Sequence, residues 1–155
     1  MRKAIFAGSF DPMTMGHLNI IQRASKMFDE VYVVVAFNFE KKTMFSADER
    51  VELIRESLSD IPNVKVDKYS GLIAEYAKNN DIKYVVRGIR NSQDAQYEIE
   101  LSLNNKFLND ELETILLPAE KEYLITSSSQ IKQFYTFGVD VKGMVPDPFW
   151  QRMTK

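Results

Sequence analysis

The sequence predicts a single α/β domain in which a parallel five-stranded sheet is covered by helices on both faces, in a doubly wound, Rossmann-like arrangement. The chain has 155 residues, of which 45% are hydrophobic and 12% are aromatic, and this content suffices for one buried core. Short runs rich in β-branched residues alternate with amphipathic stretches, as is typical of parallel strands joined by helical crossovers. No repeat, low-complexity tract or linker divides the chain, so we expect one domain over residues 1–155.

Each strand is expected from a short apolar run, and each helix from the amphipathic stretch that follows it. The expected strands are 3–7, 31–37, 64–68, 84–87 and 114–117, and the expected helices are 16–28, 47–58, 72–79, 94–109 and 128–137. Ser46 and Glu49 have the spacing of a capping box at the start of the second helix, and Gly138 follows the end of the fifth. A last short helix is expected to start at residues 149–150, after the prolines of the tail.

The composition excludes several kinds of chemistry and of partner. Twenty basic and 22 acidic residues give a formal net charge of −2, so no overall field favours nucleic acid or an anionic membrane. The absence of cysteine rules out disulfides, thiol nucleophiles and thiolate zinc sites. The longest apolar run, residues 31–37, is too short to span a membrane, and the first residues do not fit a signal peptide. We therefore expect a cytoplasmic protein.

The most informative segment is the turn after the first strand, residues 8–17, which reads GSFDPMTMGH. A strand that ends in Gly-Ser, turns through Asp-Pro and opens a helix with Gly-His aims backbone N–H groups and one imidazole at a single point. Unpaired amides at a helix N-terminus favour an anion, so the expected ligand is a phosphate. His17 is the only histidine in the chain. A lone histidine at a helix start can instead be a cap or a partly buried polar residue, but the surrounding glycine and hydroxyl residues favour function.

Two pairs of basic residues lie at or after the ends of the second and fourth strands. This is the edge of the sheet where doubly wound folds bind ligands. Lys41 and Lys42 follow the second strand; such a pair is usually solvated surface, but this position suits a phosphate-binding lysine. Arg87 and Arg90 flank Gly88 and can converge on one anion. Pairing of these arginines with surface carboxylates is the alternative.

Four consecutive hydroxyl residues, 126–129, precede the fifth helix. Ser127 and Gln130 have the spacing of a capping box, which is a purely structural explanation. Four hydroxyl residues exceed what a cap needs, and together with free helix-start amides they predict a second phosphate cradle. Several cradles on one sheet edge predict a polyphosphate and a second phosphorylated substrate.

These segments resemble the signatures of a known superfamily. Residues 8–17 resemble the (H/T)xGH signature of the nucleotidyltransferases, and residues 126–129 resemble its second, serine- and threonine-rich signature. Over its full length the chain resembles the bacterial phosphopantetheine adenylyltransferase family. The matches are Lys41-Lys42-x-Met44-Phe45, Ser70-Gly71-Leu72, Arg87-Gly88-Ile89-Arg90, Asp94-x-x-Tyr97-Glu98, Asn105 and Ser127-Ser128-Ser129. The departures are Ser9 for a common Thr, Phe39 for a common Pro, Tyr123 for a frequent Trp and Thr126 for Ile.

The resemblance implies transfer of AMP from ATP to 4′-phosphopantetheine, giving dephospho-coenzyme A and pyrophosphate, the fourth of five steps to coenzyme A. It implies a homohexamer and feedback inhibition by coenzyme A. The implied catalytic residues are His17, Lys41 and Arg90, and the implied acceptor-binding residues are Ser9, Lys41, Ile73 and Arg87. The implied ATP-binding residues are Ser9, Phe10, His17, Gly88, Ile89, Arg90, Glu98, Tyr123, Leu124, Ile125, Thr126, Ser127, Ser128 and Ser129.

The implied reaction needs no catalytic base, because the attacking phosphate oxygen is already an anion near neutral pH. The enzyme must instead align two polyanions and supply donors where charge develops. The chain has no cluster of carboxylates with ligand spacing, so we expect no metal site built from the protein alone, and Mg²⁺ to enter bound to ATP.

Two alternatives remain. The first is a sister transferase that acts on nicotinamide mononucleotide, flavin mononucleotide or glycerol 3-phosphate. The chain has no room for an attached flavin kinase domain, and its second signature is SSS rather than the STT of cytidylyl enzymes. The second alternative is a nucleotide sensor without activity. A sensor would not need His17, Lys41 and Arg90 together, so their presence favours turnover.

Overall fold

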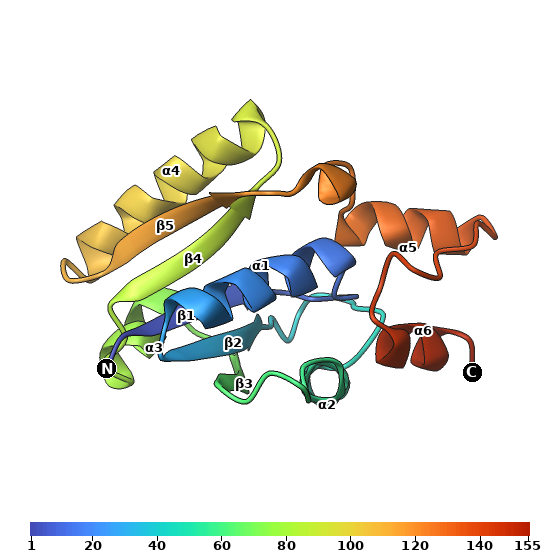
Figure 1. Cartoon of the computed structure of the whole chain (residues 1–155), viewed down its shortest axis with the longest axis horizontal. Helices are drawn as coiled ribbons and strands as arrows, with labels where there is room; N and C mark the ends of the chain where they lie inside the picture. Colours follow the sequence, from blue (N-terminus) through green and yellow to red (C-terminus); the bar gives the residue numbers. More distant parts are fainter.

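The computed structural model describes residues 1–155 and consists of one parallel sheet with helices on both sides (Figure 1). The strands are β1 (Lys3–Gly8), β2 (Glu30–Ala36), β3 (Val64–Tyr69), β4 (Tyr84–Ile89) and β5 (Glu113–Pro118). The helices are α1 (Met15–Met27), α2 (Ala47–Ser57), α3 (Ile73–Asn79), α4 (Ser92–Leu108), α5 (Ser128–Thr136) and α6 (Asp147–Met153), with a 3₁₀ turn at Lys121–Tyr123. The strand order is β3-β2-β1-β4-β5, which confirms the predicted doubly wound class.

The predicted elements all occur, and the local end signals act as expected. In α2 the Ser46 hydroxyl accepts from the Glu49 N–H at 3.1 Å, and the Glu49 carboxylate accepts from the Ser46 N–H at 3.2 Å. Gly138 follows α5 with φ of 80°, a left-handed conformation that glycine adopts without strain. The last helix, α6, begins at Asp147, two residues before the expected start at 149–150, and runs to Met153.

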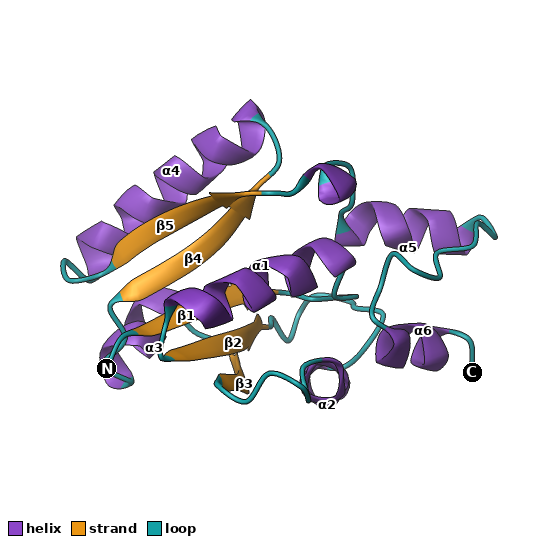
Figure 2. Cartoon of the chain, viewed as in Figure 1, coloured by secondary structure: helices purple, strands orange, loops and turns teal.

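The two faces of the sheet pack against different helices (Figure 2). The larger apolar cluster joins the sheet to α1, α2, α5 and α6, and the smaller one joins it to α3. In β2, Val33 belongs to the larger cluster and its neighbour Val34 to the smaller one. The strand therefore reads as a continuous apolar run, as expected for a parallel strand buried on both faces.

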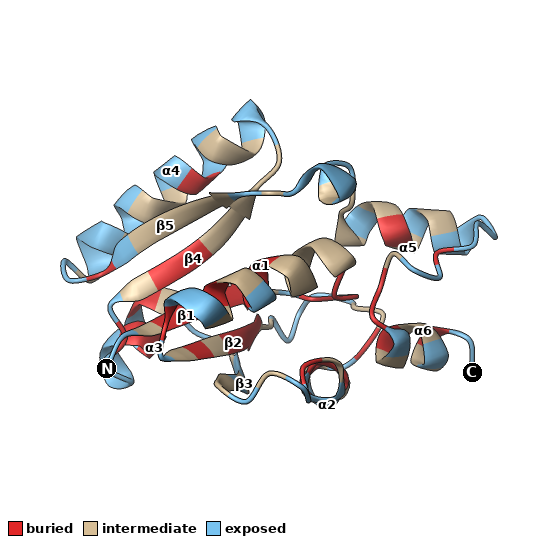
Figure 3. Cartoon of the chain, in the orientation of Figure 1, coloured by how far each residue is buried: buried red, intermediate tan, exposed pale blue.

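Helix α4 has almost no buried residues. Glu98 is its one buried residue, while Ile99, Leu103 and Phe107 are 51%, 65% and 90% exposed (Figure 3). These three positions lie four residues apart and so form one apolar stripe on the outer surface of the helix. No helix of the structure is long and apolar enough to cross a membrane.

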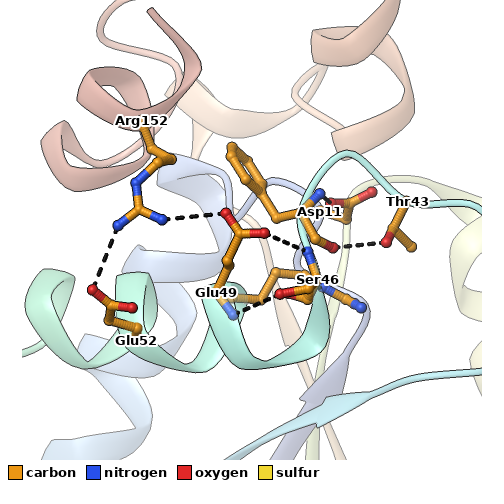
Figure 4. A network of polar contacts seen from close by, with 8 residues as sticks. Asp11, Thr43, Ser46, Glu49, Glu52 and Arg152 are labelled. Carbon is orange, nitrogen blue, oxygen red and sulfur yellow. Dashed lines mark hydrogen bonds and ion pairs between the residues drawn. The ribbon is translucent and has the colours of Figure 1, made fainter. Parts of the chain in front are cut away.

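The carboxy-terminal helix α6 is fixed against α2 and the segment before it (Figure 4). The buried ring of Phe149 meets that of Phe45 at a centroid distance of 5.9 Å and an interplanar angle of 73°. Arg152 reaches Glu49 Oε2 at 3.2 Å and Glu52 Oε1 at 3.4 Å. Helix α6 therefore packs against the segment between β2 and α2 and forms ion pairs with α2.

Candidate active site

A cavity of about 350 Å³ opens at the carboxyl ends of β1 and β4, where the strand order reverses. Its walls come from the β1–α1 turn, the end of β4, the first turns of α4 and the start of α5. The lining residues are Phe6, Ala7, Gly8, Ser9, Phe10, Thr14, Gly16, His17, Ile20, Arg87, Gly88, Arg90, Asp94, Tyr97, Glu98, Ala119, Tyr123, Thr126, Ser127 and Ser128.

The sheet itself opens at this point. The strands β1 and β4 are paired only at Ala4–Tyr84 and Ile5–Val85, whereas β1 pairs with β2 along its whole length. The side chain of Arg87 lies in the opening, where its Nη1 donates to the Ala7 carbonyl at 2.6 Å. This hydrogen bond replaces strand pairing that β4 no longer supplies to β1.

The carboxylate of Glu98 holds the other side of the same guanidinium. Nε of Arg87 donates to Oε2 at 2.7 Å, and Nη2 donates to Oε1 at 2.8 Å. Arg90 forms an i,i+4 pair with Asp94, with Nε to Oδ2 at 2.9 Å, and its side chain hydrogen-bonds lower the pKa of that carboxyl. Both arginines therefore pair with carboxylates, the alternative that the sequence left open, although Glu98 is buried rather than on the surface.

This pairing leaves donors free, because a guanidinium has five N–H groups. Arg87 uses three of them on Ala7 and Glu98, which leaves one hydrogen on each of Nη1 and Nη2. Arg87 can therefore hold the sheet opening and still meet an anion in the cavity.

His17 takes part in the cap of α1 and also lines the cavity, so the structural and the functional interpretation of this residue both apply. Thr14 is the N-cap of α1, and its hydroxyl accepts from the His17 N–H at 3.1 Å. In return, Nδ1 of His17 accepts from the Thr14 N–H at 3.0 Å. Since Nδ1 serves as the acceptor, the neutral ring carries its hydrogen on Nε2. Nε2 has no partner in the chain, so a single donor is directed to the cavity.

The surroundings keep this imidazole neutral. Desolvation, followed by the positive charges of Arg87 and Arg90, lowers the pKa of His17 from 6.5 to about 4. The rings of Phe6 and Phe10 lie edge-on to the imidazole at centroid distances of 6.0 and 5.1 Å and provide the apolar part of that environment. At neutral pH the residue is an uncharged N–H donor.

The free amides near His17 come mainly from the turn before α1. The N–H groups of Ser9 and Phe10 have no acceptor in the chain, and Phe10 has a left-handed φ of 50°. Within the first turn of α1 only the Gly16 N–H is free, because the Met15 N–H donates to Met144 and the His17 N–H to Thr14. The expectation of several free helix-start amides is therefore wrong for α1. The side chain of Phe10, 1% exposed, leaves only its backbone for a ligand.

The serine segment at the start of α5 uses its hydroxyls for structure. Ser127 caps α5 by accepting from the Gln130 N–H at 3.2 Å, and the Ser128 hydroxyl donates to the Pro12 carbonyl at 2.7 Å. Ser129 is exposed and does not line the cavity. The backbone N–H groups of Ser128 and Ser129 have no acceptor in the chain, so this cradle consists of amides more than of hydroxyls.

Several residues named from the sequence do not line the cavity. Lys41 and Lys42 lie in the exposed loop after β2, and Ile73 is the first residue of α3. Ile89, Leu124 and Ile125 also lie outside the lining. Any contact of these residues with a ligand in this cavity requires the ligand to extend beyond it or the loop to move.

Two buried charged residues beneath the turn, Asp11 and Arg50, are not predicted as site residues by the sequence. Asp11 is 1% exposed, and its carboxylate accepts from the N–H groups of Met44 and Phe45 at 2.8 and 2.9 Å. Arg50, 2% exposed, donates from Nη1 to the Ser9 carbonyl at 2.7 Å. The Asp-Pro step predicts a turn, and an aspartate in a turn is a common acceptor for backbone amides, but its partners at residues 44 and 45 have no local signal in the sequence.

The acidic side chains near the cavity already have partners within the chain. The carboxylates of Asp11, Asp94 and Glu98 are each engaged by backbone or arginine donors. No three histidine, aspartate or glutamate side chains lie close enough together to hold an ion.

Comparison with known proteins places this site in a family. The cytidylyltransferase-like family model matches residues 5–134, which include both signature segments. Phosphopantetheine adenylyltransferase of Dictyoglomus turgidum is 48% identical over 147 residues, which cover 95% of this chain and 92% of that protein. The enzyme of the same name from Dictyoglomus thermophilum is 45% identical over 95% of this chain and 90% of its own length.

The chain belongs to the phosphopantetheine adenylyltransferase family. The resemblance to this family, drawn from the sequence over its full length, is thereby confirmed. A crystal structure from Vibrio parahaemolyticus, provisionally described as a nicotinate-nucleotide adenylyltransferase, superposes over the full length of both chains with a TM-score of 0.73 and 18% identity. At that identity the similarity concerns the fold alone.

The protonation state of His17 can be measured directly, because it is the only histidine. With the folded pKa near 4 and the ordinary value at 6.5, the ring stays neutral as the pH falls from 8 to 5.5. Between these two pKa values the unfolded chain binds the proton first, so the contribution of His17 to folding stability is lost as the pH falls through that range.

We expect ¹⁵N NMR of the ring to show an Nε2–H tautomer with no titration above pH 5.5. The urea-unfolded chain, as the control, should titrate near 6.5. A folded-state midpoint near that value would contradict the account of the site.

Proposed function

We propose that the chain transfers AMP from ATP to 4′-phosphopantetheine, giving dephospho-coenzyme A and pyrophosphate in coenzyme A biosynthesis. The observation that carries this proposal is the 45–48% identity to enzymes of that name over 95% of the chain. The cavity supports it, because a neutral imidazole donor and residues with free backbone amides line the same space.

The chemistry is an in-line displacement at the α-phosphorus of ATP. A phosphate oxygen of phosphopantetheine forms the new P–O bond, the bond to the bridging oxygen of the β-phosphate breaks, and pyrophosphate leaves with that electron pair. No proton has to be removed from the nucleophile. Catalysis therefore depends on alignment and on donors placed where negative charge develops.

His17 is the donor we assign to the transition state. Its Nε2–H faces the cavity and stays uncharged, so it stabilises the developing charge on the α-phosphate oxygens without a proton transfer. The amides of Ser9 and Phe10 hold the same phosphate from the other side, and the Ser9 hydroxyl, which is exposed at the cavity, orients the acceptor. Arg90 and Lys41 complete the proposed catalytic set.

The ATP subsite is proposed to continue from His17 along the end of β4 to the start of α5. Arg90, Glu98 and the amides at the start of α5 line that side of the cavity. Glu98 acts there by holding Arg87. The remaining proposed contacts with ATP are made by backbone groups or at the entrance of the cavity. They come from Gly88, Ile89, Tyr123, Leu124, Ile125, Thr126, Ser127, Ser128 and Ser129.

The acceptor subsite is proposed to use Arg87, Lys41 and the start of α3 at Ile73. Arg87 lines the cavity and keeps two N–H groups that have no partner in the chain. Lys41 lies on the exposed loop after β2, so it reaches the substrates only when the loop closes over them or when the acceptor extends to it.

Mg²⁺ is proposed to enter as part of the substrate, bound to ATP. The acidic side chains around the cavity already have partners within the chain, and Mg²⁺ in such sites is held largely by substrate phosphates and water. Inhibition by coenzyme A is proposed because it carries the same adenylate and pantetheine groups as the product.

The activity is tested by pyrophosphate release from Mg·ATP with a panel of acceptors: 4′-phosphopantetheine, nicotinamide mononucleotide, flavin mononucleotide and glycerol 3-phosphate. We expect pyrophosphate release with 4′-phosphopantetheine and with none of the other three acceptors. His17→Ala should lower kcat by at least about 100-fold with a much smaller change in ATP affinity, the usual scale for one transition-state donor. Gln22→Ala, an exposed position on the same helix, is the control.

Turnover with another acceptor would identify a sister transferase, and release with none would identify a sensor. A His17→Ala enzyme with near-normal kcat would remove His17 from the chemistry.

Arg87→Lys tests the assignment of the acceptor phosphate. Lysine keeps the charge but cannot contact Ala7, Glu98 and a ligand at once, since it lacks the forked geometry. We expect phosphopantetheine binding, measured by calorimetry, to weaken by roughly 1–3 kcal/mol, the range for a charge-assisted hydrogen bond. Lys83→Arg on the exposed surface is the control. Weaker binding of ATP, with that of phosphopantetheine unchanged, would reverse the assignment.

A homohexamer is proposed as the assembly, and the apolar stripe of α4 supports association through that helix. Ile99, Leu103 and Phe107 expose a contiguous apolar face of the kind that marks protein interfaces. Light scattering should give six chain masses for the unmodified protein and a smaller species for Leu103→Glu. Glu100→Gln, on the same helix, should leave the mass unchanged. A monomer before any substitution would refute the proposal.

A further inference from the structure

The buried carboxylate of Asp11 joins three segments that the reaction needs in fixed relative positions. It belongs to the turn that carries the free amides of Ser9 and Phe10. It accepts from the N–H groups of Met44 and Phe45, at the base of the loop that bears Lys41. Its third partner is Lys132 in α5, whose Nζ forms an ion pair with Oδ2 of Asp11 at 2.8 Å.

Helix α5 is fastened to the turn at two successive points. The Ser128 hydroxyl donates to the Pro12 carbonyl at 2.7 Å, and Lys132 pairs with Asp11, the residue before Pro12. Residues 128 and 132 are one helical turn apart and lie on the same face of α5. Ile131, 1% exposed, buries that side of the helix in the core. The start of α5 therefore has a defined place relative to the turn.

We propose that Lys132 is a positioning residue for adenylyl transfer: its ion pair with Asp11 holds the first amides of α5 at a fixed spacing from the turn that carries His17. The inference rests on the proposed function, in which the amides of Ser128 and Ser129 hold the phosphate chain of ATP while His17 acts on the α-phosphate. Lys132 itself does not line the cavity, so it acts only through Asp11.

Removal of the Lys132 charge breaks only the ion pair between Asp11 and α5. Without it, Asp11 keeps the two amide donors of residues 44 and 45, so the loop toward Lys41 stays attached. The carboxylate loses its only formal positive partner in direct contact, and α5 keeps only the Ser128 hydrogen bond to the turn. Loss of Lys132 should therefore affect the nucleotide and spare the acceptor.

The test is Lys132→Met, which removes the charge and keeps the length and the helix propensity of the side chain. We expect the affinity for ATP, measured by calorimetry, and kcat/KM for ATP to fall by about 10- to 100-fold, since misplacement of about 1 Å has effects of that size. Binding of 4′-phosphopantetheine alone should change less than about twofold, within the scatter expected for an untouched site. Lys26→Met, an exposed lysine on α1, is the matched control, and Lys132→Arg should restore most of the affinity for ATP.

A double-mutant cycle separates positioning from general stability. If Lys132 acts through Asp11, Lys132→Met should have little further effect on ATP binding in an Asp11→Asn background. Additive losses, an equal loss for both ligands, or a loss that follows a fall in Tm would each overturn the proposal. Failure of the unmodified chain to transfer AMP would refute the proposed function instead, and the calorimetric comparison for ATP would still decide the role of Lys132.

Discussion

The guanidinium of Arg87 holds the opening on which the rest of the site depends. At the switch point β1 and β4 separate after two paired positions, and an open pair of strand edges within a sheet leaves backbone groups without partners. Arg87 satisfies the Ala7 carbonyl, and the buried carboxylate of Glu98 keeps the guanidinium in place. Its charge also contributes to the lowered pKa of His17. One side chain thus lies in the opening between the strands, forms part of the cavity wall and, through its charge, adds to the effect of the desolvation that keeps the imidazole neutral.

Ordinary helix capping holds the imidazole that we propose as the catalytic donor. The capping box of α1 would exist in any helix with Thr14 and an acceptor three residues later, but here the acceptor is an imidazole. The cap fixes the ring orientation and its tautomer, and the aromatic rings beside it remove water. Below the turn, Asp11 and Arg50 hold the backbone from the side away from the cavity, so that the amides of the turn face inward.

The fold could be predicted from sequence because its signals are local: apolar runs buried on both faces, capping residues and a glycine after α5. The turn at residues 8–17 could be located for the same reason. The pairing of Arg87 with Glu98 could not, because α4 brings together residues 11 positions apart at a geometry that only the tertiary packing defines. The ion pair of Asp11 with Lys132 spans most of the chain and has no local signature. The role of the serine hydroxyls was overestimated because Ser128 has a partner, Pro12, that is distant in sequence.

In the proposed complex, phosphate binds between His17 and the free amides while Arg87 keeps its place in the sheet opening. A crystal structure with a non-hydrolysable ATP analogue, Mg²⁺ and 4′-phosphopantetheine tests this arrangement most directly. We expect an α-phosphate oxygen in hydrogen-bond contact with Nε2 of His17, and Arg87 still bound to the Ala7 carbonyl and to Glu98. An α-phosphate away from His17, or Arg87 released from Glu98 to bind the ligand, would contradict this arrangement.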